Sequence, residues 1–114
     1  MNEKSICILG AGPAGIVTAL KLKQMGYSPL VLDFKKAGGI DFVQSLSPGV
    51  FTILETVGIG LNELREVCSP IMWSFKFWNG EMIEMENPPG FLAERNQFDS
   101  CLKKIAIEKG ISLL

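Results

Sequence analysis

The stretch Ser5–Asp33, SICILGAGPAGIVTALKLKQMGYSPLVLD, decides the fold. It opens with a short apolar run, Ser5–Leu9, which ends at a glycine and predicts a strand buried on both faces. Pro13 suits a first helical turn, because its ring pre-sets φ and its missing N–H is not needed there. Good helix formers follow to Met25, and the apolar run Ser28–Phe34 predicts a second strand. Strand, helix and strand in this order predict a βαβ unit with parallel strands.

The glycines between the first strand and the helix follow the pattern GxGxxG over Gly10–Gly15, GAGPAG. We expect Gly10 to permit the tight turn, Gly12 to let the backbone approach a pyrophosphate, and Gly15 to let the helix pack closely on the strand. The N-terminus of the helix would then face the anion. Asp33, at the end of the second strand, is expected to hydrogen-bond a ribose hydroxyl. The alternative is that the glycines serve turn geometry alone and that Asp33 caps a loop.

Further elements are expected beyond the βαβ unit. Asn79-Gly80 is a type I′ turn signal and predicts an antiparallel hairpin over about residues 70–87. Alternating Trp73, Phe75 and Phe77 in its first strand indicate core packing, with an aromatic substrate pocket as the alternative. The remaining expectations are a loop over Lys35–Leu46, a helix starting at Ser47-Pro48, a short helix over Asn62–Val67, an amphipathic helix over Asn96–Lys109 and a strand over Ile111–Leu114.

Composition excludes several function classes. The chain has 114 residues, and 11 Lys and Arg face 12 Asp and Glu, so a basic nucleic-acid surface is not expected. It has no histidine, which excludes a Ser-His-Asp triad and a His metal site within these residues. The three cysteines form no CxxC, so we expect no metal and a reducing, cytoplasmic location. The uncharged N-terminal run contains several glycines and a proline, which argues against a membrane span.

The sequence GAGPAG with Ala19, Gly26 and an acid at Asp33 resembles the N-terminal FAD-binding motif of glutathione-reductase-type flavoproteins. Those proteins usually carry glutamate at the acid position, so aspartate leaves the choice between FAD and NAD open. The resemblance implies a Rossmann-like α/β fold with an inserted antiparallel hairpin, and residues 1–114 as the N-terminal part of an FAD-binding domain. A carboxylate at this position disfavours the 2′-phosphate of NADP.

Two later segments extend the resemblance. Leu92–Asp99, LAERNQFD, is similar to the arginine-led helix of para-hydroxybenzoate-hydroxylase-like monooxygenases, in which the arginine contacts the ribose and phosphate region of the flavin. Gly38-Gly39 and Gln44–Pro48 are similar to the loop of flavin-dependent halogenases, although Gln44 replaces the usual glutamate. The cofactor-binding residues that the resemblance implies are Gly10, Ala11, Gly12, Pro13, Ala14, Gly15, Asp33, Phe34, Gln44, Ser45 and Arg95.

The resemblance implies a flavin-dependent oxidoreductase, most like a monooxygenase, in which NAD(P)H reduces FAD and oxygen is used to oxidise an organic substrate. The cofactor carries this chemistry, and no residue here is a clear acid, base or nucleophile. We expect the chain to be part of a longer polypeptide and inactive alone, with a small-molecule substrate and with neither a nucleic-acid nor a membrane partner. An NAD-dependent dehydrogenase domain, a halogenase and a non-catalytic remnant are the alternatives.

Overall fold

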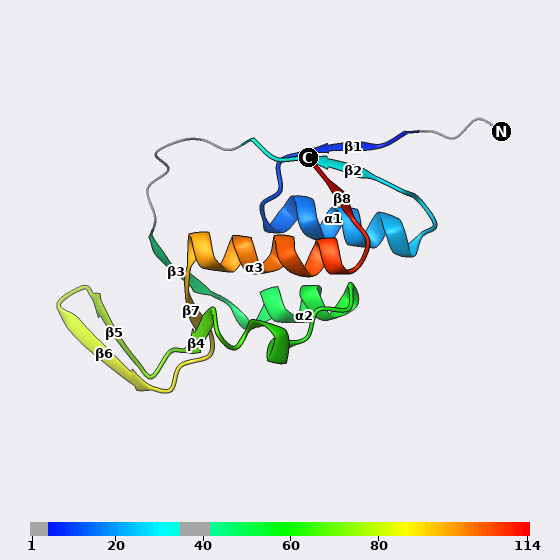
Figure 1. Cartoon of the computed structure of the whole chain (residues 1–114). Helices are drawn as coiled ribbons and strands as arrows, with labels where there is room; N and C mark the ends of the chain where they lie inside the picture. Colours follow the sequence, from blue (N-terminus) through cyan, green and yellow to red (C-terminus); the bar gives the residue numbers. More distant parts are fainter. Residues whose placement is uncertain (1–4, 35–41) are drawn as a thin grey trace.

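The computed structural model describes residues 5–34 and 42–114 of the chain. The predicted βαβ unit is present at its N-terminal end. It consists of β1 (Cys7–Leu9), α1 (Pro13–Gln24) and β2 (Leu30–Leu32), and β8 (Ser112–Leu113) adds a third strand. All neighbours in this sheet are parallel, in the order β1-β2-β8. Figure 1 shows the carboxyl ends of these strands on the same side as the starts of α1 and α3.

The excursion between β2 and α3 carries two antiparallel sheets. Its elements are β3 (Val43–Leu46), α2 (Pro48–Thr56), η1 (Leu61–Leu64), β4 (Cys68–Pro70), β5 (Trp73–Trp78), β6 (Glu81–Glu86) and β7 (Phe91–Glu94), and α3 (Arg95–Glu108) follows. One sheet has the order β3-β7-β4, and the other is the hairpin β5-β6. The rings of Phe51 in α2 and Phe91 in β7 lie 4.5 Å apart between their centroids and join α2 to the first of these sheets.

The core lies where α1, α2 and α3 pack together against the parallel sheet (Figure 1). The amphipathic helix predicted over Asn96–Lys109 is confirmed as α3, and its apolar face is buried at Phe98, Leu102, Ile105 and Ala106. No described buried residue is polar or charged. None of the described helices has the length and apolar character needed to cross a membrane.

The expectation that the first strand is buried on both faces is wrong for the described chain. Ile8 and Val31 face the helices and pack in the core, whereas Cys7 is exposed and Leu9 is 69% exposed. Successive side chains of a strand point to opposite faces, and here the helices cover one face of the sheet.

The hairpin is confirmed, but its expected core packing is not. Asn79 and Gly80 both have positive φ, 51° and 78°, as a type I′ turn requires. In the hairpin register, Phe77 lies opposite Met82 and Lys76 opposite Ile83. However, Phe77 is 76% exposed, because the hairpin extends away from the three helices (Figure 1).

Three short strands were not expected. The segment 43–46 lies in the predicted loop over Lys35–Leu46 but forms β3, and β4 and β7 are also strands. β7 lies between β3 and β4 and pairs with both, so each strand is specified by partners distant in sequence. Their sequences, VQSL, CSP and FLAE, show neither alternation nor an apolar run of four residues, so no local pattern predicts them.

The contact between Gly15 and the glycine turn fixes how α1 sits on the sheet. A Cβ placed on Gly15 would overlap the carbonyl oxygen of Gly10 and would lie 3.5 Å from the side chain of Ile8. This confirms the packing role expected for Gly15, because a side chain there would push α1 away from β1.

We predict that Gly15→Ala lowers the free energy of unfolding by about 1–3 kcal/mol, the usual cost of overpacking. Gly49→Ala is the matched control, because Gly49 also lies in the first turn of a helix and its Cβ would make only an ordinary contact with Ser47, at 3.7 Å. That variant should be neutral or more stable by up to about 1 kcal/mol. Denaturant unfolding of both variants measures the difference, and equal stabilities would contradict the close-packing account.

Candidate functional site

The glycine turn connects β1 to α1 at the carboxyl edge of the parallel sheet. Gly10 has φ +102°, a conformation that side-chain-bearing residues rarely adopt, and its N–H donates to the carbonyl of Leu32 at 2.7 Å. Gly12 is the N-cap of α1, and Pro13 occupies the first helical position. The turn therefore directs the N-terminus of α1, with its partial positive charge, toward the sheet edge where open α/β sheets bind ligands.

The guanidinium of Arg95 lies over this turn. A Cβ built on Gly12 would have one neighbour within 4 Å outside the adjacent residues, Nη2 of Arg95 at 3.9 Å. Arg95 is the first residue of α3, so a cation and the N-termini of two helices converge at one place. Such an arrangement is electrostatically favourable when an anion binds there.

Two side chains hold Arg95 in this position. Its Nε donates to Asp99 Oδ1 at 2.8 Å, one turn further along α3, and its Nη1 donates to Gln44 Oε1 at 3.0 Å. The pairing of β3 with β7 brings Gln44 opposite Ala93, two residues before Arg95. Gln44 thus joins the site by way of Arg95, a contact that the sequence did not reveal. The spacing of Arg95 and Asp99, four residues apart on a helix, is the signal that could have indicated their pairing.

Asp33 lies at the end of β2, as expected, but its carboxylate already has a protein partner. Lys103 in α3 donates to Asp33 Oδ2 at 2.7 Å. The side chain of Asp33 is 14% exposed and that of Lys103 is 30% exposed. Sequence reasoning missed this ion pair, because the two residues are far apart in the chain.

The other predicted site residues are distributed around the turn. Ala11 is buried beneath it, Ala14 lies in the first turn of α1, and Phe34 is 65% exposed just after Asp33. Ser45 is exposed, and strand alternation places it on the opposite face of β3 from Gln44. Gly38-Gly39 lie outside the described residues.

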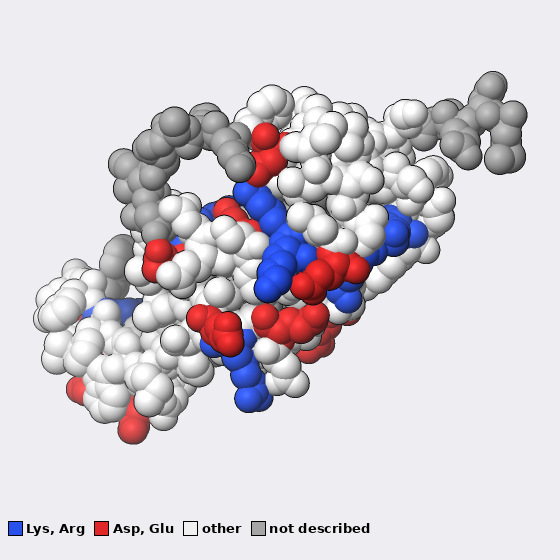
Figure 2. All heavy atoms as spheres, in the orientation of Figure 1, with Lys and Arg blue, Asp and Glu red and all other residues white. Residues whose placement is uncertain are grey.

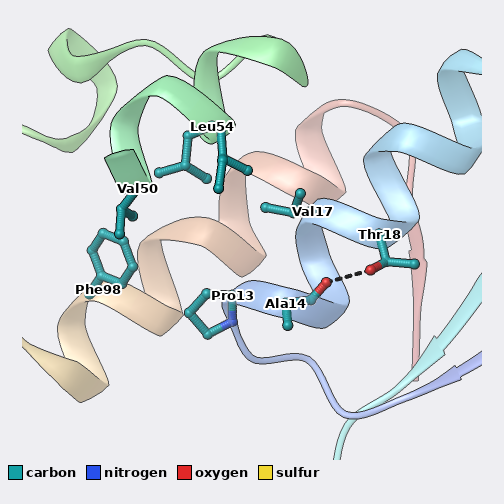
Figure 3. Close-up of a pocket in the computed structure, with 8 residues that line it drawn as sticks. Pro13, Ala14, Val17, Thr18, Val50, Leu54 and Phe98 are labelled. Carbon is teal, nitrogen blue, oxygen red and sulfur yellow. Dashed lines mark hydrogen bonds between the residues drawn. The ribbon is translucent and has the colours of Figure 1, made fainter. Parts of the chain in front are cut away.

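An apolar pocket of about 350 Å³ adjoins the turn (Figure 3). It lies between α1 and α2, and Phe98 of α3 also contributes to it. Pro13 and Ala14 are shared between this pocket and the glycine turn, as the close-up shows. The lining of the pocket is almost entirely apolar, so the pocket itself offers no binding site for an anion. The features that favour an anion are the glycine turn and Arg95.

Cys68 and Cys101 are poorly suited to act as nucleophiles. Burial raises the pKa of the Cys68 thiol, and the neighbouring Cys101 raises it further. Burial also raises the pKa of the Cys101 thiol; Lys104 acts against this rise, and nearby glutamates add to it. Both therefore stay protonated at neutral pH. In the described part of the chain, no three His, Cys, Asp or Glu side chains gather in a way that could hold a metal ion.

Comparison with solved structures identifies the architecture. A peptidyl tryptophan dihydroxylase that is essential for tryptophylquinone cofactor biogenesis aligns with 99% of this chain and 25% of its own, with a TM-score of 0.81 and 32% identity. The fold is that of the N-terminal portion of FAD-dependent monooxygenases. A p-nitrophenol 4-monooxygenase from Pseudomonas putida covers 97% of this chain and 32% of its own at 21% identity and a TM-score of 0.70. A flavin-dependent brominase aligns with 97% of this chain and 29% of its own, at 17% identity and a TM-score of 0.74.

Sequence comparison is less informative. No protein-family model matches the chain. An L-arabinitol 4-dehydrogenase from Aspergillus niger is 34% identical over 59 residues, which are 52% of this chain and 15% of that protein. The chain thus spans about a quarter to a third of the length of the solved structures that it resembles. It matches 15% of the length of the dehydrogenase. The predicted fold class, a Rossmann-like parallel unit with an antiparallel hairpin, is confirmed.

We predict that Gly12→Val abolishes dinucleotide binding while preserving the fold. Within 4 Å of a Cβ at Gly12 only Arg95 approaches among the described residues, so the branched side chain would fill the space expected for a pyrophosphate without displacing the protein backbone. Titration of the full-length protein with FAD and its unfolding temperature are the two measurements.

The control is Gly60→Val. Gly60 is also an N-cap with extended backbone and an open Cβ position, but it lies at the start of η1. That variant should bind FAD like the wild type. Unchanged FAD affinity in Gly12→Val would show that the pyrophosphate does not lie over this turn.

Proposed function

We propose that this chain binds the pyrophosphate and the adenosine ribose of FAD within a flavin-dependent, monooxygenase-like oxidoreductase. One observation carries the proposal: Gln44 and Asp99 hold the guanidinium of Arg95 over Gly12, where a glycine turn and a helix N-terminus leave open space. Arginine presents fixed, paired donors that match the oxygens of a phosphate. Asp99 already pairs with the Nε of Arg95, and a bound dianion would give the guanidinium a second anionic partner at the starts of two helices.

The residues present fit the cofactor. Glycine at position 12 permits close backbone approach, Arg95 supplies positive charge, and Asp33 lies at the strand end where the ribose of a dinucleotide is bound in this architecture. When bound, FAD would take electrons from NAD(P)H and use oxygen to oxidise a small organic substrate. This chain would bind and orient the adenosine and pyrophosphate end of the cofactor. The flavin ring at the other end of the same molecule would be positioned as a consequence.

A dehydrogenase is the second candidate, because the curated relative with 34% identity is one. The glycine turn suits any dinucleotide pyrophosphate, so the two candidates differ in which dinucleotide the protein retains. The structural matches over 97–99% of the chain favour FAD over the shorter sequence match.

We expect Arg95→Ala to weaken FAD binding by about 1.5–3 kcal/mol, roughly ten- to hundredfold, as for a lost hydrogen bond to a charged group. Arg95→Lys should restore only part of the affinity, because an ammonium lacks the paired donors of a guanidinium. The measurement is a titration of apoprotein with FAD. Arg65→Ala, which removes the exposed arginine after η1, serves as the control and should bind normally. Full affinity in Arg95→Ala would remove the phosphate role.

The redox part of the proposal has its own test. Mixing the full-length, FAD-loaded protein with NADH or NADPH in the absence of oxygen should bleach the flavin absorbance, and oxygen should restore it. If neither pyridine nucleotide bleaches a flavin that is bound, the monooxygenase assignment is wrong although FAD binding stands.

A further inference from the structure

The carboxylate of Asp33 is held in one orientation by an ion pair from another element. Lys103 Nζ lies 2.7 Å from Asp33 Oδ2, and both side chains are largely removed from solvent. Partial burial lessens the screening that makes exposed ion pairs weak. The pair therefore constrains a side chain that would otherwise rotate freely at the end of β2.

Both ends of this ion pair are anchored. The main chain of Asp33 is fixed to the residue that follows β8, because its N–H donates to the carbonyl of Leu114 at 2.8 Å. The turn of α3 that carries Lys103 is fixed by Leu102 and Ile105, which are buried in the core. Lys103 thus reaches Asp33 from a rigid helix and not from a flexible loop.

The ion pair leaves the carboxylate able to bind a ligand. An ionised carboxylate has two oxygens with about four acceptor positions, and Lys103 contacts Oδ2. Asp33 also lines an open groove of about 460 Å³ between α3 and β8. A ribose hydroxyl can therefore donate to Asp33 while Lys103 keeps its own contact.

Lys103 continues a row of charges along one face of α3. Arg95, Asp99 and Lys103 are spaced four residues apart, and residues at this spacing share a helix face. Arg95 is directed to the glycine turn and Lys103 to Asp33. Figure 2 shows basic and acidic side chains interleaved on this side of the molecule. One helix thus contacts both predicted contact points of the nucleotide.

We propose that Lys103 is a positioning residue that orients the Asp33 carboxylate toward the adenosine ribose of FAD, an inference that rests on the proposed function. By pairing with Asp33, Lys103 also offsets the repulsion between that carboxylate and the pyrophosphate of the same ligand. Lys103 contacts Asp33 and not the ligand, so its effect on the ribose is exerted through the Asp33 carboxylate.

The test is a titration of the full-length apoprotein with FAD and with its analogue that lacks the 2′-hydroxyl of the adenosine ribose. The wild type should prefer FAD to the analogue. Lys103→Met should bind FAD about tenfold more weakly and lose most of this preference, because the carboxylate is no longer held toward the ribose. Lys103→Arg retains a donor for Asp33 and should recover most of both quantities.

Two controls separate positioning from a general effect of charge or stability. Lys21→Met removes the same charge from an exposed position of α1 and should leave both affinities unchanged. In an Asp33→Asn background, Lys103→Met should cause little further loss, because the two residues act as a unit. The unfolding temperature of each variant shows that the fold persists, and Lys103→Gln gives a second neutral replacement if Lys103→Met does not fold.

The outcomes distinguish the two proposals. FAD affinity and ribose preference that stay within twofold of the wild type in Lys103→Met would overturn the role of Lys103 and leave FAD binding intact. An equal loss of affinity for FAD and for the analogue would also overturn it, since that pattern reports a structural role. A wild-type protein that does not bind FAD would overturn both proposals.

Discussion

The structure depends on the close approach of Gly15 to the carbonyl of Gly10. This contact brings the first turn of α1 against the end of β1, at a separation that leaves no room for a side chain. It therefore sets where the N-terminus of α1 points and how α1 lies on the parallel sheet. α3 packs beside α1 in the same core, so its first residue, Arg95, reaches the glycine turn as a consequence. The geometry of the candidate site follows from this one backbone contact.

α3 connects parts of the molecule that the chain itself separates widely. Its start is joined to the β3-β7-β4 sheet through the hydrogen bond between Arg95 and Gln44, and its later turns to the parallel sheet through the pair between Lys103 and Asp33. The buried face of the helix fixes its position, and the charged face then presents a cation at each of two places. Packing energy from the apolar residues thus orders polar groups whose own pairings contribute modestly to stability.

Local pattern was sufficient for much of this fold. The glycine turn, Pro13 at the helix start, the Asn79-Gly80 turn and the apolar spacing of α3 each act over a few residues, so each could be predicted from the sequence. β3, β4 and β7 could not be predicted, because their own residues show neither alternation nor a long apolar run and their pairing partners are distant in sequence. For the same reason the contact of Gln44 with Arg95 and that of Lys103 with Asp33 required the structure. The exposure of Cys7 and of the hairpin aromatics depends on which faces the helices cover, which periodicity alone does not show.

In the function proposed here, a flavin dinucleotide is held by its pyrophosphate between the turn over Gly10–Gly15 and Arg95. The most direct measurement is the identity of the nucleotide that the full-length protein retains through gentle purification, released by denaturation and determined by absorbance and mass. We expect FAD, in a ratio near one per chain. Release of NAD in its place, or failure both to retain a dinucleotide and to bind added FAD, would contradict it.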